Sequence, residues 1–428
     1  MKKTKFCSAQ DAVKAINSEN SVFIHTTPMS PNILVDAMVE RASELRNVKI
    51  FQIITNDDGG YAKPELKDSF NIHSLFVGGN VRRAVNSPQG SYTPTFLSQM
   101  PRLFEERYID LDVALIQVSP PDAHGYCSIG VSLDTSLAAM KSAKTVIAQV
   151  NSNVPRAFGD GYIHLSEIDY AVEHNSPIAE VVTPPPSEVD AAIGEYIAEL
   201  IEDGSNLQVG IGALPNAVLG NLKNHKNLGI HTEIFSDGVL PLIKSGVING
   251  KNKRIDTEKI VSTFLFGAKD LYDFVHDNPK VMLKPSSYTN NPCVISQNDK
   301  AVAINSALEI DLTGQICADT LGAYQFSGVG GQLDFTLGSS MSKGGKPIFG
   351  ISSKTHKGIS KIVPSLKQNA GVTTTRAHVQ WVVTEYGAVN LFGKSNKERA
   401  KLLISTAHPD FREELDRQAF ELLGLNKT

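Results

Sequence analysis

The chain of 428 residues is poor in several features that mark common classes of protein. No apolar run approaches the roughly 20 residues that a membrane-spanning helix needs, so we expect no membrane partner. The first residues include lysines but lack the apolar stretch of about 7 to 15 residues that a secretory signal requires. The cysteines are widely spaced and form no Cys-x-x-Cys pair: Cys7, Cys127, Cys293 and Cys317. This spacing excludes a disulfide framework or zinc site and predicts reduced thiols in a soluble, cytoplasmic protein.

Signatures of several ligands and reactions are missing as well. The formal net charge is only −4, whereas a nucleic-acid binder needs a dense basic surface, so we expect no nucleic-acid partner. The 11 histidines show no His-x-x-x-His or His-Glu-x-x-His spacing, so we expect no metal site. The absence of a Gly-x-Ser-x-Gly turn argues against a serine hydrolase of the α/β type.

The apolar residues, 41% of the chain, suffice for large cores and follow two periodicities. Between two predicted strands, Ile33–Leu45 has apolar residues at the spacing of an amphipathic helix. Strands alternating with helices predict α/β layers around a mostly parallel sheet. The short apolar runs that predict buried strands are 21–25, 48–54, 113–118 and 146–150.

Three consecutive prolines divide the chain near its middle, within Val181–Glu188. Proline has no backbone N–H and holds the chain extended, and an amphipathic helix is predicted directly afterwards at Ser187–Glu202. We therefore expect an N-terminal domain at residues 1–186 and a C-terminal domain at residues 187–428.

The two halves share a sequence pattern. A strand leads into Pro31-Asn32 in the first half and into Pro215-Asn216 in the second, and a helix and another strand follow each pair. Gly125–Ser128 and Gly314–Ala318 then follow at nearly equal distances. The pattern predicts an α/β fold of two similar open domains, a duplicated unit, with the active site in the cleft between them.

One glutamate stands out in the second half. Glu233 lies in an otherwise largely apolar strand, Leu228–Phe235, and Ile53 is at the matching place in the first half. A carboxylate at the end of a buried strand points to the crevice where α/β sheets bind ligands. With a pKa near 4.3 it is ionised at pH 7 and available as base or nucleophile. A structural glutamate that caps a helix or pairs with a lysine gives the same pattern.

Glycine-rich segments are candidates for binding a ligand through the backbone. Val209–Leu214 runs from a strand through Gly-x-Gly into a helix, whose first N–H groups favour anions or carbonyl oxygens, although a tight turn gives the same pattern. Ser327–Phe335 indicates a backbone that runs close against something flat, or a flexible surface loop. It lacks the lysine of a nucleotide P-loop, so ATP is not expected. Arg82 and Arg83 are candidates for binding an anion, or they are solvated or hold an interface.

Six long motifs follow one another along the chain, in the segments Phe76–Asn86, Val118–Gly130, Gly210–Val218, His231–Gly238, Ile304–Gln315 and Gly328–Phe335. Together they resemble the acetyl-CoA hydrolase/transferase family, the class I CoA-transferases. Within it, the chain is most similar to the 4-hydroxybutyrate and butyrate:acetate CoA-transferases. The resemblance implies the CoA-transferase fold, acyl-CoA and short-chain carboxylates as substrates, no permanently bound cofactor, and a homodimer or larger homo-oligomer. The resemblance covers nearly the whole chain.

The resemblance also implies a ping-pong reaction at Glu233. The glutamate attacks the acyl-CoA thioester, the CoA thiolate attacks the resulting anhydride, and a glutamyl-CoA thioester then passes CoA to a second carboxylate. The amide of Gly358 is implied as an oxyanion donor. Some relatives have asparagine where Cys317 aligns, which leaves the support of Glu233 open. The residues implied to bind CoA are Gly210, Ile211, Gly212, Ala213, Leu214, Leu308 and Gly331.

We therefore expect a CoA-transferase with acetate as acceptor and a donor such as butyrate, propionate or 4-hydroxybutyrate. A first alternative is an acyl-CoA hydrolase of the same family, in which water reaches the glutamyl-CoA intermediate. A second is a non-catalytic metabolite-sensing α/β module, which predicts loss of the carboxylate that this chain retains at Glu233. A third is a subunit that transfers CoA only within a lyase complex.

Overall fold

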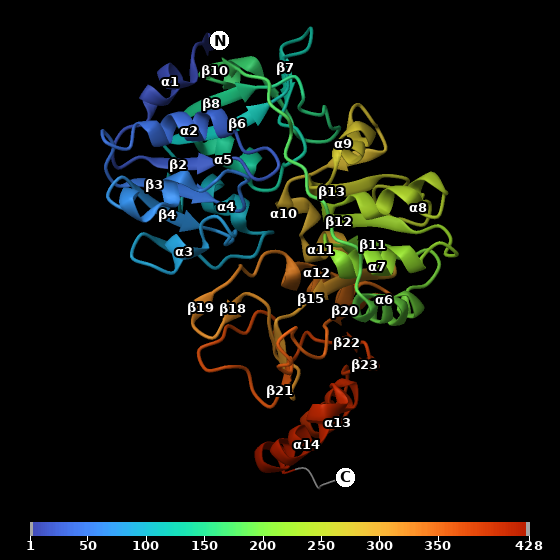
Figure 1. Ribbon diagram of the computed structural model, residues 1–428. Coiled ribbons are helices and arrows are strands. Elements are labelled where there is room, and N and C mark those ends of the chain that lie inside the picture. Colours follow the sequence, from blue (N-terminus) through green and yellow to red (C-terminus); the bar gives the residue numbers. More distant parts are fainter. Residues whose placement is uncertain (1–2, 425–428) are drawn as a thin grey trace. The chain divides into compact units, whose positions relative to one another are not determined.

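The computed structural model describes residues 3–424, which form two compact α/β units (Figure 1). Unit 1 contains the residues up to Val182 together with Val261–Thr289 and Gln325–Gly330. Unit 2 contains the remaining stretches, Thr183–Ile260, Asn290–Tyr324 and the residues from Gly331 onward. The units interleave along the chain, and the predicted division into two continuous domains at residue 186 stays a prediction. No helix within residues 3–424 is long and apolar enough to cross a membrane.

The core of unit 1 is a parallel sheet of eight strands in the order β1-β10-β8-β6-β2-β3-β4-β5. The predicted strands are confirmed, with ends within a few residues of the expected ones. The strands are β1 Lys5–Phe6, β2 Ser21–Ile24, β3 Val48–Gln52, β4 Phe70–Ser74, β5 Gly90–Tyr92, β6 Val113–Val118, β8 Thr145–Val150 and β10 Tyr170–Glu173.

Side chains that alternate along the strands of this sheet belong to two different apolar clusters. Val22 and Ile24 of β2 pack in one cluster with α1 (Ala9–Ala12), α2 (Asn32–Glu40) and α3 (Arg82–Val85). Phe23, between them, packs in the other with α4 (Met100–Glu105) and α5 (Ser136–Ser142). Because successive strand residues point to opposite faces, helices cover both faces of the sheet.

Unit 1 also includes a segment from the second half of the chain. The backbone N–H of Leu265 donates to Val131 (2.9 Å), and that of Leu283 donates to Phe158 (2.8 Å). These bonds make the segment part of the first unit rather than a linker. The elements of this segment are β13 Ile260–Leu265, α9 Lys269–Val275, β14 Val281–Leu283 and α10 Ser286–Thr289; only the first residue of β13 belongs to unit 2. Unit 1 also has an antiparallel pair of strands, β7 Tyr126–Ser128 and β9 Tyr162–His164.

Unit 2 repeats the strand order of unit 1. Its strands follow as β12-β11-β15-β20-β22-β23, all parallel except the last, as β3-β2-β6-β8-β10 do in unit 1. The predicted duplication is thereby confirmed at the level of topology. The strands are β11 Asn206–Val209, β12 Gly229–Phe235, β15 Ala301–Ser306, β20 Lys346–Gly350, β22 Trp381–Thr384 and β23 Gly387–Asn390.

The helices of unit 2 pack on this sheet in two groups. Helix α6 (Glu188–Leu200) starts where it was predicted to start, and a capping box of Ser187 and Asp190 forms its N-terminus. It packs with α7 (Ala213–Asn221). Helices α11 (Pro292–Ile295) and α12 (Gln332–Met341) pack against each other, and Phe335 of α12 joins the apolar side chains of β15.

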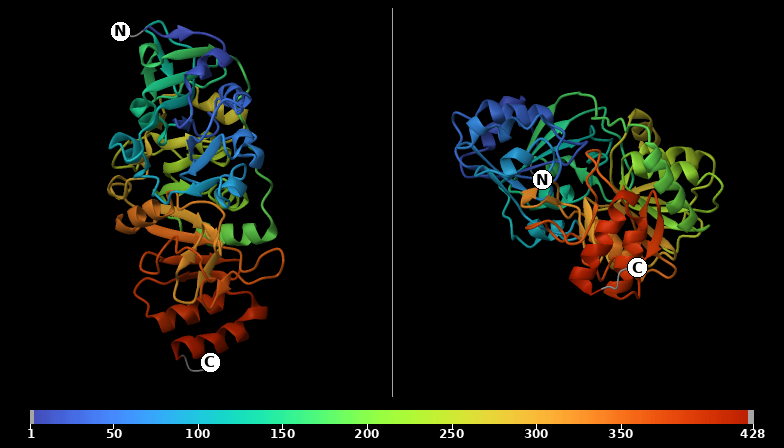
Figure 2. Two further views of the ribbon diagram at one scale, coloured as in Figure 1. Left: turned by 90° about the vertical axis from the view of Figure 1, so that its left-hand side faces the viewer. Right: turned by 60° about the horizontal axis from the view of Figure 1, so that its bottom comes forward.

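The remainder of unit 2 follows these elements. Helices α13 (Asn396–Thr406) and α14 (Pro409–Leu423) lie side by side at the end of the described chain (Figure 2). The other helix and strands are α8 Leu240–Lys244, β16 Glu309–Asp311, β17 Ile316–Cys317, β18 Thr320–Leu321, β19 Tyr324–Gln325 and β21 Ile362–Val363. The second residue of β19 belongs to unit 1.

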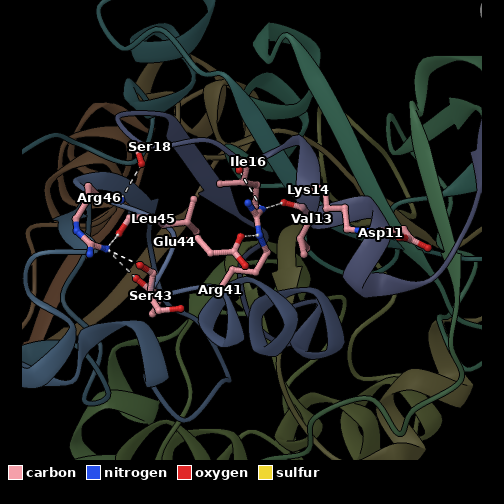
Figure 3. A network of polar contacts seen from close by, with 11 residues as sticks. Asp11, Val13, Lys14, Ile16, Ser18, Arg41, Ser43, Glu44, Leu45 and Arg46 are labelled. Carbon is pink, nitrogen blue, oxygen red and sulfur yellow. Dashed lines mark hydrogen bonds and ion pairs between the residues drawn. The ribbon is translucent and has the colours of Figure 1, made fainter.

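Helix α2 ends earlier than its periodicity predicts. The expected helix reached Leu45, but the structure ends it at Glu40 and continues in turns, with the N–H of Ala42 bonded to Val39 three residues back. The guanidinium of Arg41 turns away to the carbonyl of Ile16 (3.0 Å; Figure 3). The Arg46 guanidinium donates to carbonyls of the turns that follow the helix, those of Ala42, Ser43 and Leu45.

Candidate functional site

One edge of the unit 2 sheet gathers most of the predicted site residues. Strands β12, β11, β15 and β20 are parallel, and their register pairs Leu207 with Ile230 and Val209 with Ile304. Their carboxyl ends therefore meet at the same edge, where α/β sheets bind ligands. Glu233 lies in the last part of β12, and Gly210–Leu214 follows β11.

The carboxylate of Glu233 is held by a residue that the sequence did not indicate. Nδ2 of Asn290 donates to Oε2 of Glu233 (2.7 Å). Asn290 is fully buried, whereas Glu233 is half-buried. A buried amide that donates to a carboxylate favours its ionised form and fixes its orientation. Asn290 lies 57 positions further along the chain, in a polar stretch without periodicity that gave no signal.

Gly331 lies directly against the same carboxylate. A Cβ added to Gly331 would collide with Oε2 of Glu233 and with Nδ2 of Asn290, and it would lie 3.1 Å from Cδ of Glu233. Gly331 is the N-cap of α12, so the carboxylate is next to the N-terminal end of a helix of ten residues. Such an end stabilises a negative charge, because its first N–H groups have no acceptor within the helix.

The loop Gly210–Leu214 joins β11 to α7 beside Glu233. The N–H of Val209, just before the loop, donates to Oγ1 of Thr232, just before Glu233 (3.2 Å). Gly212 is the N-cap of α7 at φ +121°, a conformation that favours glycine. Ile211 is exposed, while Ala213 and Leu214 form the first helical turn and are half-buried. The loop thus offers backbone N–H groups at the edge that holds the carboxylate.

Two other predicted residues of unit 2 follow β15 and β20. Leu308 lies two residues beyond the carboxyl end of β15, which is at the same edge, and is half-buried; its N–H donates to the carbonyl of Cys317 (2.8 Å). Gly358 lies in an exposed turn at φ +74°, and its N–H donates to the carbonyl of Thr355 (2.9 Å). That bond must open before the amide can serve an oxyanion, and the role of Gly358 stays a prediction.

Cys317 is the residue whose alignment left the support of Glu233 open. It is buried in β17, and its thiol donates to the carbonyl of Thr320 (3.2 Å). The observed support of the carboxylate comes from Asn290 instead.

The glycine-rich segment before α12 lies against an aromatic ring. A Cβ on Gly328 would lie 2.8 Å from Phe76, and one on Gly330 would lie 3.0 Å from the same ring. The expectation of a backbone close against something flat is therefore confirmed. All three residues belong to unit 1, whereas Gly331, the next residue, belongs to unit 2.

Comparison with protein families gives two matches that together cover most of the chain. The acetyl-CoA hydrolase/transferase N-terminal domain matches residues 2–183. The acetyl-CoA hydrolase/transferase C-terminal domain matches residues 267–419.

Individual proteins are similar over nearly their full length. A 4-hydroxybutyrate coenzyme A transferase of Clostridium kluyveri is 50% identical, with 96% of each chain covered. A butyryl-CoA:acetate CoA-transferase of Anaerostipes caccae is 37% identical over 97% of this chain and 96% of the relative. Among solved structures, RipA from Yersinia pestis superimposes with a TM-score of 0.93 at 36% identity, covering 98% of both chains. The chain belongs to the acetyl-CoA hydrolase/transferase family and is an enzyme of the CoA-transferase type.

Proposed function

We propose that this enzyme moves CoA from a short-chain acyl-CoA to a carboxylate acceptor through a glutamyl-CoA thioester at Glu233. The observation that carries this proposal is the placement of the Glu233 carboxylate, which accepts the Asn290 amide at 2.7 Å and lies against Gly331 at the start of α12. A carboxylate held in one orientation at a helix N-terminus stays ionised and is available as a nucleophile.

The reaction exchanges one thioester for another in paired steps. An oxygen of Glu233 attacks the thioester carbon, the carbon–sulfur bond breaks, and an acyl-glutamyl anhydride and CoA thiolate form. The thiolate attacks the glutamyl carbonyl, the anhydride bond breaks, and the first acid leaves as its carboxylate. A second carboxylate attacks the glutamyl-CoA and reverses the sequence. The energy of the thioester is conserved, so the chemistry requires no ATP and no permanently bound cofactor.

Orientation and charge stabilisation are the contributions that this chain must supply. A carboxylate is a weak nucleophile, and holding it against the thioester contributes about 7 to 11 kcal/mol. Each addition forms an oxyanion, for which one well-placed donor is worth roughly 2.7 to 4 kcal/mol. We assign the CoA path to Gly210, Ile211, Gly212, Ala213 and Leu214, with further contacts from Leu308 and Gly331 and an oxyanion donor at Gly358.

Borohydride reduction tests the covalent step directly. The protein is incubated with acetyl-CoA, reduced with borohydride and analysed by peptide mass. The peptide that contains Glu233 should become lighter, because a glutamyl thioester is reduced to an alcohol whereas a free carboxylate is not. Glu233→Gln should show neither the mass change nor transfer activity.

A second glutamate of unit 2 provides the matched control. Glu195→Gln replaces an exposed residue of α6 and should keep both the label at Glu233 and the activity. An unlabelled Glu233 in the wild type, or full activity in Glu233→Gln, would contradict the mechanism.

We propose acetate as the acceptor and butyrate, propionate or 4-hydroxybutyrate as the acid of the donor. The names of the similar proteins, a 4-hydroxybutyrate and a butyryl-CoA:acetate transferase, support this range. One methylene in a hydrophobic pocket changes the transition-state energy by only about 1 to 3 kcal/mol, so several short acids should react. The four acids can be ranked as acceptors by letting them compete for one acyl-CoA and separating the resulting CoA esters by chromatography. A preference for water over all four acids would favour the hydrolase.

A further inference from the structure

Gln332 is the first residue of helix α12, directly after Gly331, and its side-chain amide joins two other parts of unit 2. Nε2 of Gln332 donates to the carbonyl of Ser306 (2.8 Å). Oε1 of Gln332 accepts the hydroxyl of Thr374 (3.0 Å). Because a carbonyl can only accept, the bond to Ser306 assigns the amide nitrogen to that side and leaves the amide oxygen for Thr374. Both ends of the amide are thus used.

Both partners of Gln332 are held in place by their own backbone. Ser306 is the last residue of β15 and pairs with Gly350 of β20. Thr374 is fully buried, and its backbone exchanges hydrogen bonds with that of Ile316 in β17 (3.0 and 3.2 Å). Ile316 is itself fully buried in an apolar cluster of unit 2. The amide therefore ties the start of α12 to two close-packed parts of the same unit.

The start of α12 depends on such a tie, because its N-cap residue is a glycine. Gly331 lacks the side chain with which other N-cap residues bond the first N–H groups of a helix. Glycine also has more backbone freedom than any other residue, so it does not by itself hold the helix in one direction. Yet the backbone of Gly331 lies against the Glu233 carboxylate and the Asn290 amide, with no room for a Cβ.

We propose that Gln332 is a positioning residue for the transfer reaction and that Thr374 acts through it. Consecutive Cα atoms are about 3.8 Å apart across a trans peptide, so the place of Gln332 limits where Gly331 can lie. By bonding to Ser306 and Thr374, the amide keeps the N-terminal end of α12 against the carboxylate of Glu233. All of these residues belong to unit 2. This inference rests on the proposed role of Glu233 as the nucleophile.

The first test removes the amide of Gln332 and keeps the length of the side chain. Gln332→Met lacks both the donor and the acceptor that join α12 to Ser306 and Thr374. A misplacement of about 1 Å can cost about 10²-fold in rate, so we expect kcat to fall about 10- to 100-fold. The KM for acyl-CoA should change less than about threefold, because the loop Gly210–Leu214 of the assigned CoA path is not altered. Wild-type kcat, or a loss that appears in KM alone, would overturn the proposal.

The second test asks whether Thr374 acts through Gln332. Thr374→Val replaces the hydroxyl with a methyl group and should lower kcat about 2- to 10-fold, the contribution of one neutral hydrogen bond. Thr374→Ser keeps the hydroxyl and should keep most of the rate. In the double variant Gln332→Met/Thr374→Val the loss should be no larger than in Gln332→Met alone, because the two residues share one contact. Losses that multiply would mean that Thr374 acts independently of Gln332, which contradicts the proposal.

A threonine of helix α13 provides the matched control. Thr406 is also buried, and its hydroxyl donates one hydrogen bond, to the carbonyl of Leu403 (2.9 Å). Thr406→Val should lower the midpoint of thermal unfolding about as much as Thr374→Val, but it should keep the wild-type kcat. An equal loss of kcat in both variants would mean that the rate follows the stability of unit 2 rather than the place of α12, and the proposal would fail.

Borohydride trapping separates this inference from the proposed mechanism. In a single turnover with acetyl-CoA, Glu233 should be labelled more slowly in Gln332→Met than in the wild type, to the same final extent. Equal labelling rates would overturn this inference and leave the covalent mechanism standing. An unlabelled Glu233 in the wild type would refute the covalent mechanism, and the kcat values of the variants would still decide whether Gln332 positions the site.

Discussion

Gly331 leaves the space that the Glu233 carboxylate and the Asn290 amide occupy, so at this residue a single methyl group has a large effect. Gly331→Ala must displace one of these two groups, and we expect kcat to fall by at least about 10²-fold. Gly220→Ala is the control, because a Cβ at Gly220 meets nothing within 4 Å on helix α7. It should keep activity and stabilise the helix by about 0.5 to 1 kcal/mol. Steady-state kinetics and thermal unfolding of both variants check this, and an active Gly331→Ala would contradict it.

The amide of Asn290 should set the pH range over which Glu233 is a nucleophile. Asn290→Asp would place a second carboxyl group at the position that now donates at 2.7 Å. Two carboxylates in one site cannot both ionise readily, so the higher pKa of the pair rises. The acidic limb of the kcat profile should therefore move to higher pH, with activity lost as pH falls through the raised pKa.

Asn290→Leu separates the added charge from the lost donor. It removes a hydrogen bond to a charged group, worth about 1.5 to 3 kcal/mol, and should lower kcat about 10- to 100-fold. Its acidic limb should move less than that of Asn290→Asp, because no second carboxyl is present. An Asn290→Asp profile identical with the wild type would show that this contact does not support the nucleophile.

The contrast between Glu233 and Asn290 shows what the sequence can reveal about this site. A carboxylate in an apolar strand is conspicuous, so Glu233 could be singled out, although its role became specific only through the family resemblance. Asn290 follows Tyr288 and Thr289 in a polar stretch, where another polar residue is ordinary. Its contact with Glu233 is made by the tertiary fold, for which local sequence has no signal.

A buried lysine next to the start of β12 makes the stability of unit 2 depend on pH. Lys253 is 3% exposed, and its Nζ donates to the carbonyls of Ile230 (3.0 Å) and Lys259 (2.8 Å). Burial lowers the pKa of Lys253 to about 8. Between this value and the ordinary pKa of lysine, near 10.4, the unfolded chain binds more protons than the folded one.

The free energy of unfolding should therefore rise with pH between about 8 and 10, by up to about 1.4 kcal/mol per pH unit from this group. Urea titrations followed by the fluorescence of Trp381, in β22 of unit 2, can measure it. The variant Lys253→Met has no such group. The free energy of unfolding of the wild type should therefore increase relative to that of the variant as pH rises. A constant difference would show that the ammonium is not buried.

At the scale of elements, predictions made from local signals are the accurate ones. The amphipathic pattern that starts at Ser187 places the start of α6, and the apolar runs place β6 and β8. The predicted end of α2 was wrong by five residues, because the apolar periodicity continues to Leu45 while the chain turns after Glu40 and Arg46 donates to carbonyls of those turns. Such side-chain contacts depend on geometry that an apolar pattern does not contain.

The whole molecule should stay together when its proline-rich segment is cut. Pro184, Pro185 and Pro186 are exposed, so a protease recognition sequence inserted there is accessible. After cleavage the two fragments should elute together, because Val261–Thr289 is bonded into unit 1 through Val131 and Phe158. Gel filtration before and after cleavage, with a denatured sample as control, checks this. Fragments that separate without denaturant would contradict the interleaved arrangement.

Sequence reasoning anticipated the duplicated unit but not the interleaving. The Pro-Asn pairs lie at or near the starts of the helices α2 and α7 in the two halves, and parallel α/β units follow from strand–helix alternation. The assignment of Gln325–Gly330 to unit 1 depends on contacts with Arg82 and Asn86, more than 230 positions away. Long-range contacts of this kind leave no periodic pattern in a single sequence.

The interleaved chain has a consequence for how the protein is made. Synthesis proceeds from the N-terminus at about 5 to 20 residues per second, so roughly 7 to 30 s separate the appearance of Val182 from that of Gly330. During this interval the nascent unit 1 lacks β14, α9 and the segment that ends it. A ribosome-bound chain therefore exposes the surfaces on which these pieces dock, and chaperones can bind them. The unit that contains the nucleophile is completed later still, because β20, β22 and Gly358 are translated after Gly330, so unit 1 is complete before the catalytic unit is.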